Sequence, residues 1–535
     1  MPAVAEASID GAPRAAWAWA ELPRAALVAL LAACAVLPSV YLLGTALPVL
    51  GAGGWLAHFA STTLPHQAAT SLQVALQASA VAFAVGALPA VLVSRYEFAG
   101  RSLVTALALL PLLFAPSVTA TTWSVLYSSD FFFSRHALAL HLGLACSPYL
   151  FVVFRVAAAR TPQAYAELAA SLGLGWRQRL LRVHTPVYAV PVAAGLLIVF
   201  AQSIGDYAAA ERLGVQTLSV GLHNLWLASQ DSQVAAIAAT VMIVPVVALV
   251  LVAAWAATSI MSRNPVSAAA AAARRQRLGR PATAALLTWS AGWSLPGFFL
   301  PEAFTVRWAW LAWERARFDT LRADLLNTAG TAAATAAAVL AVCLLTAVVL
   351  RAGGRSRLAE RLPWLFLANF FLPSLVLALA FVMMSRDGAL LAQWLGALRD
   401  TRLMIVMPEA LRFLPLAMLP MLDALRRTPP AMVEAARAFG AGPLRARGVA
   451  YAGHLLPALV LGAALVFMES VKALDLSLTL QPFGYSSLAL KIYAFSRFQN
   501  MDRAAVWVLL SQALMLAPLL LLWWRLRRLD AGPGA

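Results

Sequence analysis

Long apolar runs alternate with polar loops along the whole chain. Each run has about 18 or more residues, which is enough to cross a bilayer as a helix. About twelve such runs occur, at residues 25–50, 70–94, 103–126, 137–159, 187–209, 233–260, 283–301, 325–350, 363–385, 403–425, 455–475 and 504–524. The pattern predicts an all-α polytopic membrane protein with about twelve transmembrane helices.

An Ala- and Arg-rich polar stretch at residues 261–282 divides the runs into two sets of six. We therefore expect a first half at residues 1–260, a cytoplasmic linker, and a second half at residues 283–535. Since each half has an even number of spans, both halves have the same orientation, as in transporters built from parallel repeats. The pair Pro116-Ser117 recurs as Pro373-Ser374, which supports a duplication with a substrate path between the halves.

The composition fits a membrane protein, and the arginines predict its orientation. Of the 535 residues, 62% are hydrophobic and 12% charged, about half the charged fraction of a typical soluble protein. The net charge of +17 could indicate nucleic-acid binding, but the arginines concentrate in alternate loops and at both termini. The positive-inside rule places these segments in the cytoplasm. We expect a multi-pass protein of the bacterial inner membrane, surrounded by lipid, without a nucleic-acid partner.

Two basic loops carry the same short pattern at matching points of the two halves. The first reads TPQAYAELAASLG from Thr161 to Gly173, and the second reads TPPAMVEAARAFG from Thr428 to Gly440. In each, Thr can cap a helix that starts at the following Pro, the Ala pair keeps one face small, and Gly can end the helix. An ordinary helical hairpin explains one such loop. Two loops with the same spacing predict a docking surface for a cytoplasmic partner.

The predicted docking surface belongs to loops 161–186 and 428–457. Its residues are Glu167, Ala169, Ala170, Gly173, Glu434, Ala435, Ala436 and Gly440.

Polar residues within the apolar runs are candidates for a translocation path, because charges inside spans are costly and tend to be functional. Glu469 and Lys472 are three residues apart, so they can pair on one helix face. A structural ion pair near the headgroups is the alternative. A similar pair, Glu409 and Arg412, is interpreted as structural. The candidate path residues are Ser117, Thr121, Gln202, Asp206, Ser374, Glu469, Lys472 and Asp475. Thr121 can instead bond its own helix backbone.

The sequence offers no catalytic or metal-binding constellation. The seven His residues form no ligand cluster, and the three Cys residues all lie in apolar runs. A Gly-x4-Gly-Lys-Ser/Thr phosphate loop is absent, so the chain cannot hydrolyse ATP by that route. We expect no catalytic residue, no metal site and no cofactor bound by this chain.

The paired loops resemble the EAA motif of type I ABC importer permeases, Glu-Ala-Ala-x3-Gly followed by a Pro. The first loop has Leu168 in place of the first Ala and keeps Pro186, whereas Gly453 replaces that Pro in the second loop. The resemblance covers nearly the whole chain and implies a permease with both halves fused. It implies two partners: a cytoplasmic ABC ATPase dimer, which uses the ATP and holds the loops, and a periplasmic or extracellular solute-binding protein.

Two segments resemble ferric-iron permeases of the binding-protein-dependent family. They are GDYAAAERLGVQTLSVGLHNLW from Gly205 to Trp226 and ESVKALDLSLTLQPFGYSSLALKIY from Glu469 to Tyr493. The second segment departs from that family at Ala473, Asp475 and Gln481. The resemblance implies ferric iron as cargo, with thiamine or another small solute as the alternative.

Two other classes remain as alternatives. A self-contained secondary transporter would need intramembrane carboxylates for ion coupling, and the chain has few candidates. A membrane enzyme would need a loop with paired carboxylates or a metal cluster, and no loop qualifies. Neither class explains the paired loops.

Overall fold

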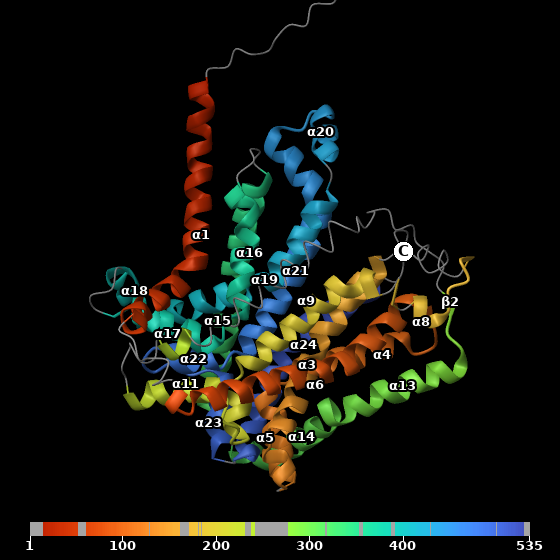
Figure 1. Ribbon diagram of the computed structural model, residues 1–535, viewed down its shortest axis with the longest axis vertical. Helices are drawn as coiled ribbons and strands as arrows, with labels where there is room; N and C mark the ends of the chain where they lie inside the picture. The colour runs from red at the N-terminus through yellow and green to blue at the C-terminus, as the bar shows by residue number, and fades with distance from the viewer. Residues whose placement is uncertain are drawn as a thin grey trace, which may run out of the picture.

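Helices make up nearly all of the described chain, which confirms the predicted all-α class. The computed structural model describes residues 14–51, 60–127, 129–160, 171–179, 181–182, 185–229, 237–240, 276–315, 318–351, 357–386, 391–428, 430–498 and 500–528. Figure 1 shows α20 at one end of the molecule and α5, α14 and α23 at the opposite end.

The elements of the first half are α1 (Arg14–Gly51), α3 (Leu64–Arg95), β1 (Tyr96–Glu97), α4 (Arg101–Leu109), η1 (Leu110–Leu113), α5 (Pro116–Leu126), η2 (Asp130–Phe133), α6 (Arg135–Arg160), α8 (Trp176–Arg179), α9 (Thr185–Ile204), α10 (Ala208–Arg212) and α11 (Leu218–Ser229). Those that follow are β2 (Gln276–Arg277), α13 (Arg280–Ser294), η4 (Leu295–Phe299), α14 (Leu300–Ala312), η5 (Trp313–Arg315), α15 (Phe318–Arg351), α16 (Arg357–Phe371), α17 (Ser374–Met384), α18 (Ala392–Leu398), α19 (Leu403–Arg427), α20 (Pro430–Ala438), α21 (Pro443–Lys472), α22 (Asp475–Leu480), α23 (Leu488–Arg497) and α24 (Met501–Arg528).

Seven helices within the described ranges are long and apolar enough to cross a membrane. They are α1, α3, α6, α15, α19, α21 and α24, and each coincides with one of the predicted runs. Their burial differs strongly: 83% of the apolar window of α6 is buried, against 28% in α1 and in α21. Helix α6 is therefore central, while α1 and α21 keep much of their surface for lipid or for a partner.

Two predicted spans are sharply bent instead of straight. Residues 101–113 and 116–126 meet at 86°, and residues 361–371 and 374–384 meet at 104°. Pro116 and Pro373 lie at the breaks, because a proline lacks an amide hydrogen and disfavours a helical conformation for the preceding residue. Ala115 is accordingly extended, with φ −74° and ψ 141°. The repeated Pro-Ser pair thus marks the same break in both halves.

Two further predicted runs, 187–209 and 283–301, are not single spanning helices. In run 187–209, α9 ends at Ile204 and α10 begins at Ala208; between them, the Asp206 side chain accepts the Ala209 amide (2.9 Å). Run 283–301 is divided among α13, the π-helical turn η4 and α14, and Pro296 lies in that turn. Run 233–260 lies mostly outside the described residues.

The second half repeats the order of elements of the first. Helices α3, α4–α5, α6, α9, α10 and α11 have the counterparts α15, α16–α17, α19, α21, α22 and α23. One hydrogen bond recurs as well: the Leu218 amide donates to Ser71 Oγ (2.7 Å), and the Leu488 amide donates to Thr328 Oγ1 (2.8 Å). The bonds join α11 to α3 in the first half and α23 to α15 in the second, as expected for a structural duplication.

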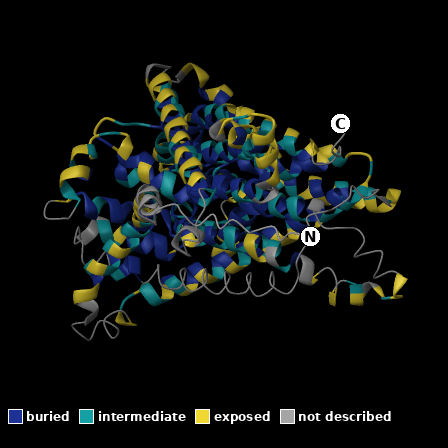
Figure 2. Cartoon of the chain, turned by 90° about the horizontal axis from the view of Figure 1, so that it is seen from above, coloured by how far each residue is buried: buried dark blue, intermediate teal, exposed yellow. Residues whose placement is uncertain are grey.

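The two halves share their core. One buried cluster joins Leu150 and Phe151 of α6 to Met468 of α21 and Leu519 of α24. Buried residues fill the middle of the molecule, and exposed residues lie around it (Figure 2). The end of the predicted linker is also fixed, because β2 pairs in parallel with β1 after α3. Residues 261–275 of the linker lie outside the described part.

Candidate functional site

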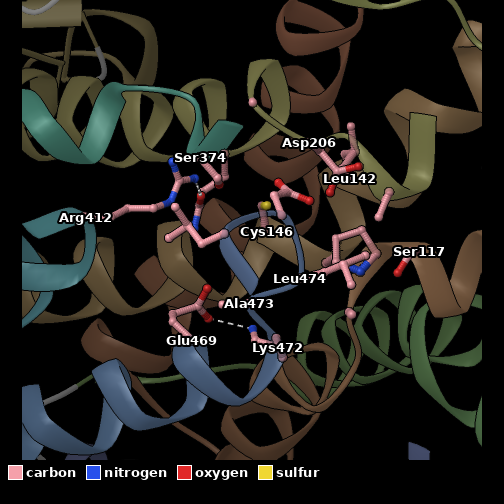
Figure 3. A pocket seen from close by; sticks show the side chains of 18 of the residues that line it. Ser117, Leu142, Cys146, Asp206, Ser374, Arg412, Glu469, Lys472, Ala473 and Leu474 are labelled. Carbon is pink, nitrogen blue, oxygen red and sulfur yellow. Dashed lines mark hydrogen bonds and ion pairs between the residues drawn. The ribbon is translucent and has the colours of Figure 1, made fainter. Parts of the chain in front are cut away.

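A polar cavity of about 110 Å³ lies where the two halves meet. Helices α5, α6 and α9 contribute from the first half, and α17, α19 and α21 from the second (Figure 3). Its polar and charged lining residues are Ser117, Tyr149, Gln202, Asp206, Ser374, Arg412, Glu469, Lys472 and Asp475. The structure thus brings seven of the eight candidate path residues together.

The bends and helix ends explain how these side chains meet. Ser117 and Ser374 lie in the first turns of α5 and α17, directly after the proline breaks. Asp206 follows the end of α9, and Asp475 begins α22 just after the end of α21. Each half therefore presents a Ser just after its proline break and an Asp shortly after the end of α9 or α21, as expected for a site between two repeats.

Glu469 receives two donors. Lys472 Nζ lies 2.6 Å from Glu469 Oε1, so the predicted pair is present, and the Tyr149 hydroxyl donates to the same oxygen. The Glu469 and Lys472 side chains are only 11% and 13% exposed, which makes their charges costly unless they remain paired. In Figure 3 the dashed line between Glu469 and Lys472 marks this ion pair beside the cavity.

Arg412 is a second cation of the site, although its spacing from Glu409 predicts a different partner. Arg412 Nη2 donates to Gln202 Oε1 (2.9 Å), and Nη1 donates to the Leu372 carbonyl. Arg412 is 4% exposed, and both of its partners come from other helices or from the bend before α17. It links the first half to the second at the cavity wall.

The predicted Glu409–Arg412 pair is wrong. Glu409 Oε2 accepts the hydroxyls of Thr335 (3.0 Å) and Ser470 instead. Glu409 faces α15 and α21, while Arg412 faces the cavity, so contacts between helices replace the local pair. The position of Arg412 within an apolar run indicated a functional role, because a charge inside a span is costly. Tyr149 was also missed, and its position within an apolar run gave no such signal.

Thr121 is the candidate path residue that does not line the cavity. Its side chain is fully buried, and its hydroxyl donates to the Ser117 carbonyl (2.7 Å). The hydroxyls of Thr122 and Ser124 likewise donate to carbonyls of α5. This polar patch therefore satisfies its own helix.

The second basic loop forms a short helix, a sharp turn and a long helix. Glu434 and Ala435 on α20 are exposed, Ala436 is half-buried, and Phe439 at the tip is 92% exposed. α20 is presented at the end of the molecule, away from the cavity (Figure 1).

Gly440 ends α20 in the left-handed conformation, which glycine adopts more readily than other residues. Its φ is +84°, its amide donates to the Arg437 carbonyl (2.9 Å), and the Ala441 amide donates to the Ala436 carbonyl (3.1 Å). These two bonds define a Schellman motif, which satisfies carbonyls at the helix end.

The predicted cap at Thr428 is wrong. Helix α20 begins at Pro430, and Thr428 instead ends α19, with its hydroxyl donating to the Ala424 carbonyl (3.1 Å). The extended Thr428 backbone turns the chain between the two helices.

In the first loop, Gly173 has φ +68° and leads into α8. The turn therefore resembles that at Gly440. Glu167, Ala169 and Ala170, with the start of the loop, lie outside the described residues.

Within the described ranges, no three His, Cys, Asp or Glu side chains gather in a way that could hold a metal ion.

Comparison with known proteins gives one family. Residues 82–263 and 350–528 each match the family model described as binding-protein-dependent transport system inner membrane component. The two matches together cover more than half of the chain, and each includes one of the paired loops. No curated protein matches the chain.

Proposed function

Because the chain belongs to the family of binding-protein-dependent transport system inner membrane components and matches it once in each half, we propose that it forms the complete membrane path of an ABC importer for ferric iron. A periplasmic or extracellular binding protein delivers the cargo. A separate ATPase dimer docks on the cytoplasmic loops and hydrolyses the ATP. Both termini then lie in the cytoplasm.

Helix α21 connects the docking loop to the cavity. It runs without interruption from Pro443, just after the turn at Gly440, to Lys472. A helix of its 30 residues is about 45 Å long. When the ATPases close, movement of α20 is therefore passed along α21 to Glu469 and Lys472. In the first half, α9 leads in the same way from loop 161–186 to Gln202 and Asp206.

The paired carboxylates of the cavity carry the proposal of a cationic cargo. Asp206 and Asp475 follow the ends of the equivalent helices α9 and α21, and Glu469 adds a third carboxylate. Lys472 pairs with Glu469, whereas the hydrogen bonds of Arg412 go to the neutral Gln202 amide and the Leu372 carbonyl. Oxygen-rich surroundings suit a hard cation, and the nearby positive charges prevent tight retention.

The size of the cavity favours iron over thiamine. Its volume of about 110 Å³ is smaller than the ~150 Å³ cavity that holds one benzene molecule. In this conformation the cavity therefore suits a partly hydrated metal ion better than a two-ring organic cation. Thiamine remains the second candidate, because it is also a cation and a transport cycle widens the path.

Uptake measurements test this function. We expect cells lacking the gene to lose binding-protein-dependent radioiron uptake and to keep radiothiamine uptake. The double variant Asp206→Asn/Asp475→Asn should behave like the deletion, because it removes the paired charges. Asp130→Asn is the matched control, since Asp130 is exposed on η2, outside the cavity. Loss of thiamine uptake alone would move the chain to the second candidate, and unchanged uptake of both would refute either cargo.

A further inference from the structure

Four side chains that no function has yet explained form a cluster between the two halves. Tyr207 and Glu211 come from the α10 segment, His223 from α11 and Tyr493 from α23. Tyr207 Oη lies 3.2 Å from Tyr493 Oη, and Tyr493 Oη donates to Glu211 Oε2 at 2.9 Å. The His223 and Tyr207 rings are 4.3 Å apart between centroids. All four residues fall in the two segments that resemble iron permeases.

The cluster has unused coordinating capacity. His223 is 8% exposed, and within the described chain its buried Nδ1 has no hydrogen-bond partner. A buried imidazole nitrogen without a partner is costly, so it calls for a ligand or a water. Tyr, Glu and His together supply hard oxygen donors and an imidazole, both of which suit iron.

The oxygen spacing fits a metal ion. In an octahedral site with metal–oxygen bonds of about 2.0–2.1 Å, neighbouring ligand oxygens lie about 3 Å apart. The Tyr207, Tyr493 and Glu211 oxygens are already spaced at 2.9 and 3.2 Å. We propose that these three side chains, with His223, form a transit site for ferric iron; this inference rests on the proposed iron cargo.

The cluster lies beside the central cavity. Tyr493 lines a small pocket of about 30 Å³ together with Ser117 and Lys472, and those two residues also line the central cavity. The small pocket and the central cavity therefore adjoin each other, with Tyr493 in the lining of one and the carboxylates in the lining of the other.

With both tyrosines bound as phenolates and Glu211 as a carboxylate, three negative charges balance those of Fe³⁺. Each tyrosine that binds Fe³⁺ as a phenolate releases one proton to water. Arg497 Nε lies 3.5 Å from Glu211 Oε1, and its side chain is 61% exposed, so it can turn to solvent when the ion binds. Its nearby positive charge also favours release of the ion, which transport requires.

Visible absorption of the purified full-length protein tests the site, because a phenolate bound to Fe³⁺ gives a charge-transfer band that neither component has alone. Ferric nitrilotriacetate is the probe, since it leaves coordination positions open. We expect the band in the wild-type protein, a weaker band in Tyr207→Phe and in Tyr493→Phe, and none in the double variant. Tyr485→Phe is the matched control, because Tyr485 bonds Thr331 Oγ1 (2.9 Å) outside the cluster. Its band should equal that of the wild type.

A wild-type protein without the band, or a double variant that keeps it, overturns the transit site. Size-exclusion profiles show whether each variant is folded, and Tyr→Phe keeps the ring packing. Radioiron uptake in the same strains separates this inference from the proposed function. Iron-dependent uptake without a band refutes the site alone, whereas absence of radioiron uptake in wild-type cells refutes the cargo whatever the spectrum shows.

Discussion

At the scale of single residues, two donors stabilise the buried carboxylate of Glu469. It is 9% exposed and holds both the Lys472 ammonium and the Tyr149 hydroxyl. Removing one partner of a buried ion pair leaves an uncompensated charge, while removing both charges is often neutral. A variant that removes one charge therefore measures the cost of burying the other, whereas a variant that removes both tests whether the pair is needed for transport.

We predict that Lys472→Met lowers the free energy of unfolding by about 3 kcal/mol. The double variant Glu469→Gln/Lys472→Met should recover most of that loss. Thermal unfolding in detergent measures both. Equal melting temperatures for the single and the double variant would contradict the prediction. If the double variant is stable and transports normally, the pair has no role in the path.

The hydrogen bonds of Arg412 show why the spacing of residues along one helix did not predict all contacts of the site. The Glu469–Lys472 pair followed from a spacing of three residues, and it is present. The same spacing failed for Glu409 and Arg412, because Thr335 and Ser470 reach Glu409 from neighbouring helices. The rule that residues three apart can pair considers one helix, whereas the partners of Glu409 and Arg412 depend on the packing of several helices.

At the scale of elements, the proline breaks decide where Ser117 and Ser374 lie. The apolar runs predicted seven spanning helices well, because apolarity and length determine which segments can cross a bilayer. They did not predict the 86° and 104° bends, although Pro116 and Pro373 were visible in the sequence. The bend directions, and hence the cavity, depend on the helices packed around them.

We predict that Pro373→Ala reduces transport strongly, because a continuous helix through the break would move Ser374 away from the cavity. Pro518→Ala, within the continuous helix α24, is the matched control and should transport normally. Radioiron uptake, corrected for the amount of protein in the membrane, measures the effect. Equal uptake by both variants would show that the break is dispensable.

The turn after α20 gives a second prediction at this scale. Gly440 has φ +84°, where a β-branched side chain is strained by about 1–3 kcal/mol. Gly440→Val should therefore distort the Schellman turn and weaken co-purification with the ATPase. Gly442→Val is the control, because Gly442 has φ −58° and open space around its Cα. Similar ATPase recovery for both variants would contradict a docking role of this turn.

At the scale of the whole molecule, the halves are held together by packing as well as by the chain. Val28 and Leu31 of α1 belong to a buried cluster with Val339 and Phe366 of the second half. The helices of one half thus cover apolar surface of the other, which favours association without a covalent link.

We predict that the halves, expressed as separate chains divided within residues 261–275, assemble and restore radioiron uptake. Each half alone should give none, because the cavity needs residues from both. Co-purification through a tag on one half measures assembly. If both halves reach the membrane but do not associate, the predicted domain boundary is wrong.

The cavity is less symmetric than the fold, and this has an evolutionary consequence. Both of its cations, Arg412 and Lys472, come from the second half, while Ala145 and Gly205 line the wall at the matching first-half positions. A homodimer of identical halves would place every substitution on both sides of the path at once. A single gene encoding both halves lets each wall mutate alone, so selection can adjust the charge around the cargo one residue at a time.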